Sequence, residues 1–183
     1  AGTAARSLTP VDPPAAFDAT LRPYQERGLS WLAFLSSLGL GSCLADDMGL
    51  GKTVQLLALE SAHRSANPGA GPTLLLCPMS LVGNWQRESA KFAPQLHVYA
   101  HHGRERLRGD ALRERLAVTD LIVTTYATGT RDIDELSPPG KRDGAEIRFD
   151  IELGVQNAGH PGRLNWQIVP SALDRGCGPL IFS

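Results

Sequence analysis

Cysteine is scarce in this sequence of 183 residues, and its spacing excludes two kinds of stabilising site. The three cysteines, Cys43, Cys77 and Cys177, are odd in number and far apart, and no Cys-x-x-Cys pair occurs. Neither a zinc site nor a disulfide framework is therefore indicated. Cys43 and Cys77 stand in apolar runs, which predicts reduced core cysteines of the kind found in cytosolic proteins.

Long hydrophobic runs and an excess of one charge are also lacking. No segment approaches transmembrane length, and the first residues lack a charged-then-apolar signal pattern, so we expect no membrane partner. The formal net charge is −1, which excludes a global basic field that would attract nucleic acid. Any DNA contact must then come from a local patch. Hydrophobic residues at 42% and charged residues at 20% are ordinary for a globular domain of this length.

Apolar runs and helical periodicities alternate along the middle of the chain. Helices are predicted at 22–38, 52–66, 80–93 and 104–117, and strands at 42–45, 73–77, 96–99 and 121–124. The runs TLLLC and LIVT are continuously apolar, as expected for strands that are buried on both faces. This alternation predicts an α/β fold with a mainly parallel sheet, helices on both faces and right-handed crossovers.

Composition changes at both ends of this pattern. Residues 1–20 are rich in alanine and proline and are interpreted as a linker. Residues 137–183 hold seven glycines and five prolines without a long periodic segment, although 147–153, 164–169 and 179–182 could form short strands. We therefore predict a lobe over 21–136, followed by an irregular and divergent tail that is disordered or non-native.

The strongest chemical signal is the sequence DDMGLGKT at residues 46–53. A Gly-x-Gly-Lys-Thr turn between a strand and a helix aims backbone N–H groups and the positive end of the helix dipole at one point, which suits a phosphate. Lys52 would add a charge for the β- and γ-phosphates, and Thr53 a hydroxyl for Mg²⁺. The general pattern has glycine where Asp46 stands. A chance glycine turn is the alternative, and the flanking strand and helix disfavour it.

With these residues in view, the chain resembles the Swi/Snf-type chromatin-remodelling ATPases, a branch of helicase superfamily 2. DDMGLGKT is the form that the phosphate loop takes in that family, so Asp46 is expected there. Further matches fall in order: LRPYQERGLSWL at 21–32, LLLCPMSLVGNWQRE at 74–88 with the family's motif Ia, and DLIVTTYAT at 120–128 with its motif Ib. The resemblance implies that the chain is the N-terminal RecA-like, P-loop NTPase lobe of a DNA translocase. The matches are most similar to the bacterial members of the family.

The resemblance also implies roles for individual residues. Gln25 would read the adenine edge, and the ATP-binding set would be Gln25, Asp46, Asp47, Met48, Gly49, Leu50, Gly51, Lys52 and Thr53. Lys52 and Thr53 would act in catalysis, with Thr53 on Mg²⁺. Double-stranded DNA would be the partner of the complete protein, and its phosphate backbone would meet Ser80, Asn84, Thr124, Thr125 and Tyr126.

A local basic cluster follows the third predicted strand. His101, His102, Arg104, Arg106 and Arg108 could contact DNA, but interleaved acids make a solvated helix face an equal alternative. The histidine pair has no third ligand nearby, so a metal site is not expected.

The resemblance stops after about Glu135. No apolar strand ending in Asp-Glu-Ala-His or Asp-Glu-Ala-Gln follows: residues 133–136 contain Asp-Glu without a preceding strand, and in 149–152 the two acids are separated by one residue. That motif would hold Mg²⁺ and orient the attacking water, and a second lobe would supply an arginine.

We therefore expect that this chain binds ATP and Mg²⁺ without hydrolysing ATP. A frameshift, a truncation or an insertion would explain why the acidic motif is missing. The expected location is the bacterial cytoplasm, at the nucleoid. Two other functions stay open: a P-loop kinase for a small molecule, and a non-catalytic interaction module.

Overall fold

The computed structural model describes residues 8–38, 42–44, 49–136, 150–155 and 164–169, and the fold is given for these alone. The helices are α1 (Pro23–Ser37), α2 (Lys52–Ala66), α3 (Met79–Phe92), α4 (Gly109–Leu116) and α5 (Tyr126–Leu136). The strands are β1 (Ser42–Leu44), β2 (Thr73–Leu76), β3 (Val98–His101), β4 (Leu121–Thr124), β5 (Asp150–Val155) and β6 (Leu164–Val169). Among these residues no helix is long and apolar enough to cross a membrane.

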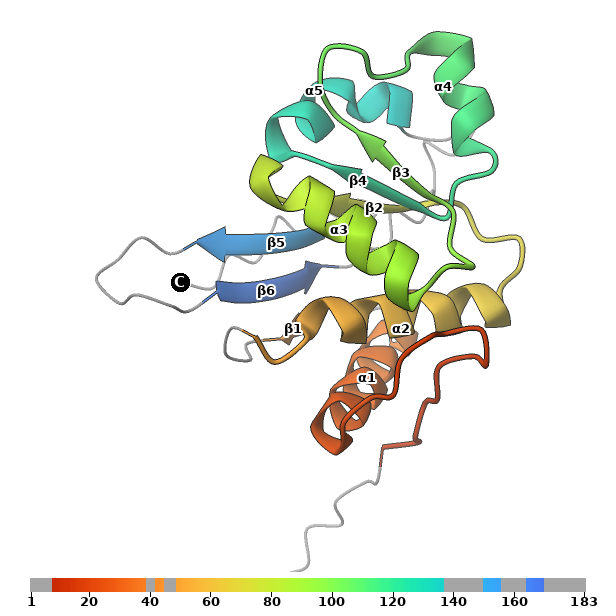
Figure 1. The fold of residues 1–183 in the computed structure, drawn as a ribbon, viewed down its shortest axis with the longest axis vertical. Helices are drawn as coiled ribbons and strands as arrows, with labels where there is room; N and C mark the ends of the chain where they lie inside the picture. The colour runs from red at the N-terminus through yellow and green to blue at the C-terminus, as the bar shows by residue number, and fades with distance from the viewer. Residues whose placement is uncertain (1–7, 39–41, 45–48, 137–149, 156–163, 170–183) are drawn as a thin grey trace, which may run out of the picture.

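A three-stranded parallel sheet organises the lobe (Figure 1). Its order is β2-β4-β3, and β4 is the central strand. Leu76, Thr124 and His101 are register partners at the last rung, so the three strands end at one edge of the sheet. Because the carboxyl ends of parallel strands carry the connecting loops that bind ligands, this edge is the natural place for a site.

Both faces of the sheet are covered, as the alternation predicts. Leu75, Leu121 and Val123 belong to one core cluster with residues of α1, α2 and α3. The alternate strand residues Leu74 and Ile122 pack on the other face against α4 and α5. Successive side chains of a strand point to opposite faces, so the continuous apolar runs of β2 and β4 serve both clusters.

Strand β1 differs from the single parallel sheet that the sequence predicts. It pairs antiparallel with β6, and β6 pairs antiparallel with β5, in a second sheet of order β1-β6-β5. The strands expected within 147–153 and 164–169 therefore form, although β5 starts at Asp150. The strand expected at 179–182 and the side chains of Asp150 and Glu152 lie outside the described residues.

The prediction of a helix over 104–117 is wrong in its first half. Helix α4 begins only at Gly109, and the chain from His102 to Arg108 is a loop bounded by Gly103 and Gly109, which have φ values of 86° and 55°. A left-handed backbone at these two positions interrupts a right-handed helix, and glycine adopts it without steric cost. Strand β3 is also displaced: Leu96 lies in the preceding turn, where its N–H donates to Ala93 O at 2.9 Å.

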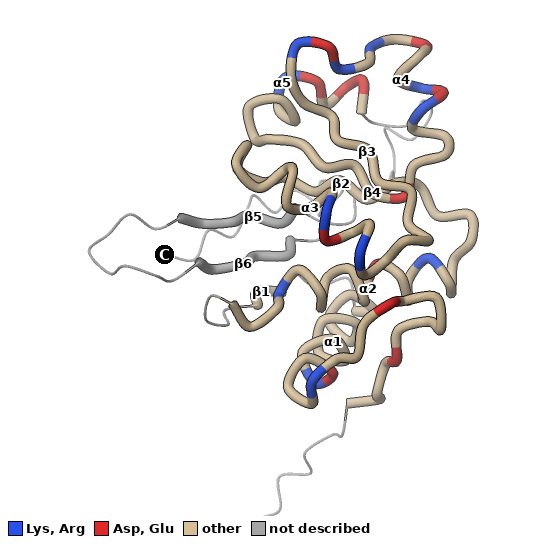
Figure 2. The backbone as a smooth tube through the Cα atoms, viewed as in Figure 1, with Lys and Arg blue, Asp and Glu red and all other residues tan. Residues whose placement is uncertain are grey.

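Helix α5 is not anticipated by the sequence pattern. It begins directly after β4 and is kinked at Asp132, whose φ and ψ are −106° and 15°. Gly129 lets the helix approach the sheet, since a Cβ there would lie 2.6 Å from Leu76 Cδ2. Charged residues are concentrated on the loop after β3, on α4 and on α5 (Figure 2). Opposite charges thus face each other where α5 meets that loop.

Candidate nucleotide and nucleic-acid site

The described part of the phosphate loop has the backbone that a phosphate cradle requires. Gly49 and Gly51 have φ values of 87° and 74°, in the left-handed region that side chains disfavour. Gly51 is the N-cap of α2, so the loop feeds straight into the helix. The predicted residues Asp46, Asp47 and Met48 lie outside the described residues, and their placement stays a prediction.

Helix α2 directs its N-terminus at this loop. The first amide to bond within the helix is that of Gln55, which donates to Gly51 O at 3.2 Å. The amides of the preceding turn therefore point toward the loop, together with the positive end of the helix dipole. Lys52 is 6% exposed and Thr53 is half-buried, in the first turn of the helix. The sequence-predicted Lys52 and Thr53 are thus brought to the end of the helix where an anion would bind.

Helix α1 contacts the same loop through two neighbouring side chains. Gln25 Nε2 donates to Leu50 O at 3.0 Å, and Tyr24 Oη donates to the same oxygen at 3.1 Å. Gln25 Oε1 accepts from Arg22 N at 2.9 Å. A Cβ at Gly51 would lie 2.4 Å from Gln25 Nε2, so glycine at that position is what lets the amide reach the loop.

A second glutamine lies behind the loop and is not satisfied. Gln55 is fully buried, and among the described residues neither Nε2 nor Oε1 of its amide has a hydrogen-bond partner. The amide rests on helix α1, because a Cβ at Gly28 would lie 2.1 Å from Gln55 Oε1. Each of the two helices therefore presents a glutamine to a glycine of the other element, Gln25 to Gly51 and Gln55 to Gly28.

At the carboxyl edge of the sheet, the predicted DNA-contacting residues come from two adjacent strand ends. Ser80 is exposed in the first turn of α3, just after β2. Asn84 lies one turn later, where its Nδ2 donates to Glu88 Oε1 at 2.9 Å. Thr125 and Tyr126 follow β4, which is hydrogen-bonded to β2. Thr125 Oγ1 accepts from Thr128 N at 3.4 Å and so caps the start of α5.

Thr124 does not belong to that surface. Its side chain is fully buried, and its Oγ1 donates to His101 O at 2.6 Å across the sheet. A residue at the last rung of a central strand has neighbours on both sides, so its hydroxyl is used to join β4 to β3. The structure therefore brings Ser80, Thr125 and Tyr126 to one edge and leaves Thr124 beneath it.

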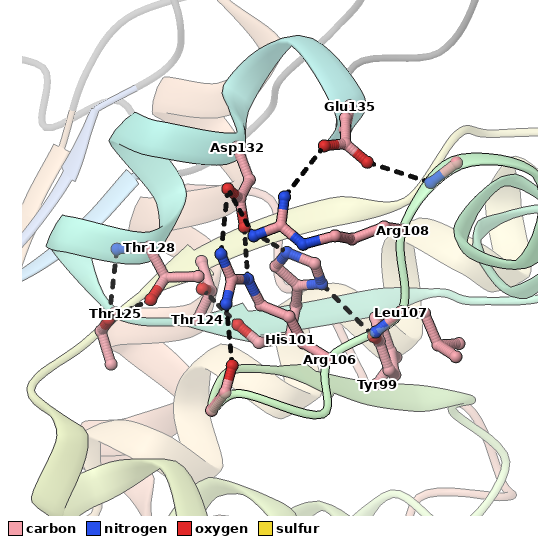
Figure 3. Close-up of polar contacts among 12 residues, drawn as sticks. Tyr99, His101, Arg106, Leu107, Arg108, Thr124, Thr125, Thr128, Asp132 and Glu135 are labelled. Carbon is pink, nitrogen blue, oxygen red and sulfur yellow. Dashed lines mark hydrogen bonds and ion pairs between the residues drawn. The ribbon is translucent and has the colours of Figure 1, made fainter.

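The basic cluster after β3 is mostly an internal ion network (Figure 3). Arg106 is 7% exposed, and its guanidinium donates to Asp132 Oδ2 at 2.5 Å and to Gly103 O at 2.8 Å. His101 is fully buried, with Nε2 3.0 Å from the same Asp132 oxygen. Arg108 pairs with Glu135 at 3.4 Å, and Glu135 Oε2 accepts from Gly109 N at 3.0 Å.

This network fixes the loop to α5 and sets the charge of its members. The Arg106 guanidinium, with the His101 hydrogen bond, holds the pKa of Asp132 at about 2, because these bonds to the ionised form outweigh desolvation, which raises the pKa. The hydrogen bond to Asp132 in turn raises the pKa of Arg106. Of the five basic residues expected to contact DNA or solvent, His102 and Arg104 remain exposed without a role in the network. Neither a DNA contact nor a solvated helix face therefore describes the main feature of the cluster, which is the ion network with Asp132 and Glu135.

The sequence did not single out Tyr24, Gln55 or Asp132. Tyr24 stands beside Gln25, which is the only sequence signal that could have indicated it. Gln55 looks like an ordinary polar helix residue, and Asp132 like a solvated acid. Their roles depend on contacts across 26 to 31 positions, as in Tyr24 with Leu50 and Asp132 with His101.

Residues 24–143 match the family of SNF2-related domains. The chain is 43% identical over 135 residues to YwqA of Bacillus subtilis, whose name describes an ATP-dependent helicase/translocase, with 74% of this chain and 15% of YwqA covered. It is 39% identical over 139 residues to the TATA-binding protein-associated factor MOT1 of Saccharomyces cerevisiae, covering 70% of this chain and 7% of MOT1.

A solved structure shows the same arrangement. The SWI2/SNF2 ATPase core of Sulfolobus solfataricus in complex with dsDNA superposes with a TM-score of 0.59 and 42% sequence identity. The match covers 69% of this chain and 25% of that chain. The chain therefore spans a small part of the length of the proteins that it resembles.

Proposed function

The chain belongs to the family of SNF2-related domains, and from this premise we propose that it binds ATP with Mg²⁺ at the junction of α1, the phosphate loop and α2. One observation carries the proposal: Gly49 and Gly51 turn the loop into the N-terminus of α2, while Gln25 and Tyr24 of α1 meet the same loop at Leu50 O. A triphosphate suits the helix end, and a base suits a primary amide beside it.

The residues present fit a magnesium ion bound with the nucleotide. Mg²⁺ prefers oxygen ligands and usually keeps several waters beside phosphate oxygens, so a single protein hydroxyl is enough. Thr53 lies in the first turn of α2, where its hydroxyl would supply that ligand. The ion would neutralise charge on the β- and γ-phosphates, and Lys52 would add a second positive charge.

Hydrolysis is a separate matter. The helix α5 contains Asp134 and Glu135, so this acidic pair does not end a strand as a catalytic pair of the family would. We propose that the described residues of this lobe bind nucleotide without turnover, and that the full reaction uses groups beyond them. The small-molecule kinase is not favoured, because the family match and the solved structures both indicate an SNF2-type ATPase lobe.

We also propose a duplex DNA contact at the carboxyl edge of the sheet, through Ser80, Asn84 and Thr125; the hydroxyl of the predicted Tyr126 is buried and is not part of this contact. The helices α3 and α5 both begin at this edge, and hydroxyl and amide groups at helix starts bind phosphates without reading sequence. The related ATPase core of Sulfolobus solfataricus was solved in complex with dsDNA, which supports this partner.

Calorimetric titration with ATP and Mg²⁺ tests the nucleotide proposal. We expect saturable binding by the wild-type chain and loss of most of it in Lys52→Ala, because the charge on the phosphates is no longer matched. Lys91→Ala, an exposed lysine near the end of α3, is the control and should bind as the wild type does. Equal binding by wild type and Lys52→Ala would refute a site at the phosphate loop, and no binding at all would favour the non-catalytic module.

A further inference from the structure

We propose that Tyr24 is a positioning residue that determines nucleotide specificity. Its hydroxyl keeps the phosphate loop attached to α1, through a hydrogen bond to Leu50 O, when the Gln25 side chain turns toward the nucleotide base. The proposal rests on the proposed ATP function and adds a residue and an exchange of hydrogen bonds to it. Tyr24 need not touch the nucleotide. It acts by replacing a hydrogen bond that base recognition removes.

The starting point is a carbonyl oxygen with two donors. Leu50 O accepts from Gln25 Nε2 at 3.0 Å and from Tyr24 Oη at 3.1 Å. A backbone carbonyl has two lone pairs, so both bonds are satisfied together. Both donors come from the first turn of α1, and the acceptor lies between the two glycines with positive φ. The loop is therefore attached to α1 at one atom by two residues.

Both ends of the Gln25 amide are hydrogen-bonded within the protein in this arrangement. Its Nε2 is on Leu50 O, its Oε1 accepts from Arg22 N at 2.9 Å, and the residue is 7% exposed. A glutamine reads an adenine edge with both its N–H donor and its carbonyl acceptor. Because the side chain is 7% exposed and directed at Leu50 O and Arg22 N, we infer that base recognition by Gln25 turns the amide outward, away from these two atoms.

If no other donor were present, loss of the Gln25 bond would cost free energy, because Leu50 is partly buried and its carbonyl would lose its partner. The Tyr24 hydroxyl removes that cost, since it already donates to the oxygen that Gln25 would release. Tyr24 is half-buried, so its ring is held by the surrounding chain rather than by the hydroxyl alone. The pair can then exchange one bond without releasing the phosphate loop.

The substitution Tyr24→Phe isolates this role, because it deletes one oxygen and keeps the ring. In the variant Leu50 O depends on Gln25 alone, so Gln25 is retained on the loop and base recognition competes with it. We expect the affinity for ATP to fall about fivefold, the equivalent of one hydrogen bond, while the affinity for inorganic tripolyphosphate stays unchanged. Tripolyphosphate has no base, so its binding leaves Gln25 where it is.

Two controls separate this effect from a general loss of structure. Tyr99→Phe also deletes a hydroxyl that is hydrogen-bonded, to Leu107 N at 3.2 Å, but at β3, and it should leave the ratio of ATP to tripolyphosphate affinity unchanged. Gln25→Leu by itself should remove the preference for ATP over tripolyphosphate. Adding Tyr24→Phe to Gln25→Leu should then leave the ratio of the two affinities unchanged. If Tyr24→Phe changed the affinity ratio in the Gln25→Leu background as much as in the wild type, the proposed exchange of hydrogen bonds at Leu50 O would be refuted.

A measurement without nucleotide tests the shared acceptor directly. In chemical denaturation, Tyr24→Phe and Gln25→Leu should each be mild, and the double variant should lose more stability than the sum, because only then is Leu50 O left without a donor. If the losses in the free energy of unfolding were additive, the claim that Tyr24 and Gln25 share Leu50 O as an acceptor would be refuted.

The outcomes also distinguish this inference from the proposed function. Absence of ATP binding by the wild type overturns the proposed function, and the exchange with it. Normal ATP binding by the wild type with an unchanged affinity ratio in Tyr24→Phe overturns the exchange alone.

Discussion

At the scale of single residues, the unsatisfied amide of Gln55 is the least expected feature. Its two polar atoms are buried, with Oε1 against Gly28, and have no partner in the part of the chain that the structure describes, whereas buried polar atoms in folded proteins are nearly always hydrogen-bonded. An orphaned amide costs free energy that an apolar side chain of similar size would avoid. Gln55 therefore reduces the stability of the α1–α2 contact.

We predict that Gln55→Met raises the free energy of unfolding by about 1 kcal/mol, because a polar group without a partner is replaced by an apolar one of similar volume. Urea denaturation measures the change. Leu57→Met, at another fully buried position of α2, is the matched control and should be neutral or slightly destabilising. A lower stability for Gln55→Met would mean that the amide has a partner such as a bound water.

Asp132 is the opposite case, a buried acid whose partners satisfy it. Replacing it by asparagine removes the main counter-charge of the Arg106 guanidinium, so we predict a clear loss in the free energy of unfolding. Asp134→Asn removes the same charge from an exposed position of the same helix and should change stability little. Equal effects of the two substitutions in urea denaturation would contradict the buried network.

The same residue predicts a dependence on acid. The pKa of Asp132 is about 2 in the folded chain against an ordinary value of 3.8, so the folded state favours the ionised carboxylate. Its contribution is therefore fully present above the ordinary pKa and is lost as the pH falls toward the folded value. The stability difference between wild type and Asp132→Asn should shrink as the pH is lowered through this window. A difference that is constant with pH would show that Asp132 is not ionised in the fold.

At the scale of elements, the connection from α2 to β2 depends on one arginine. Arg64 Nε donates to Glu60 Oε1 at 2.6 Å, and its other nitrogens donate to Ala70 O, Gly71 O and Asp120 O at 2.7 Å each. Burial raises the pKa of Glu60, and Arg64 opposes that rise. The end of α2, the following turn and the start of β4 are thus held by one guanidinium.

Arg64→Ala is therefore expected to destabilise the chain by about 3 kcal/mol, since it leaves Glu60 buried and three carbonyls without their donor. Arg113→Ala is the control, because Arg113 is an exposed residue of α4 paired only with exposed Asp110. Thermal unfolding of both variants measures the effect. A small change for Arg64→Ala would show that the turn is held by its backbone alone.

Elements were predictable from the sequence where burial alone decides them. The apolar runs of β2 and β4 and the long periodicities of α1 and α2 left little choice, and their bounds agree with the structure within about two residues. The start of α4 and the whole of α5 were not predictable in that way. Arg104 to Arg108 look like a charged helix face until Asp132 binds Arg106, and Thr128-Gly129-Thr130 has low helix propensity until Gly129 packs on Leu76.

The site was predictable to a similar degree. The motif around Gly49 to Thr53 placed the phosphate loop correctly between β1 and α2. Burial of Thr124 and the contacts of Tyr24 were not predictable, because they depend on which neighbour lies across the sheet or across the loop. Spacing along the chain locates a motif, whereas hydrogen-bond partners 20 or more positions away require the fold.

At the scale of the whole molecule, the two sheets lie beside each other where β5 contacts β2. Strand β1, which precedes the loop, pairs with β6, whereas β2, β4 and β3 form the sheet whose edge carries the proposed DNA contact. The chain covers 25% of the Sulfolobus ATPase core that it resembles. The proposed nucleotide and DNA contacts therefore lie in different parts of one lobe.

Steady-state ATP hydrolysis with and without double-stranded DNA, compared between wild type and Lys52→Ala, is the most direct test of a lobe that binds nucleotide without turnover. We predict that wild type and Lys52→Ala are equally inactive under both conditions, although the wild type is expected to bind ATP much more tightly. Turnover that rises with DNA and disappears in Lys52→Ala would contradict this prediction. Asp150 and Glu152 would then be the first carboxylates to substitute.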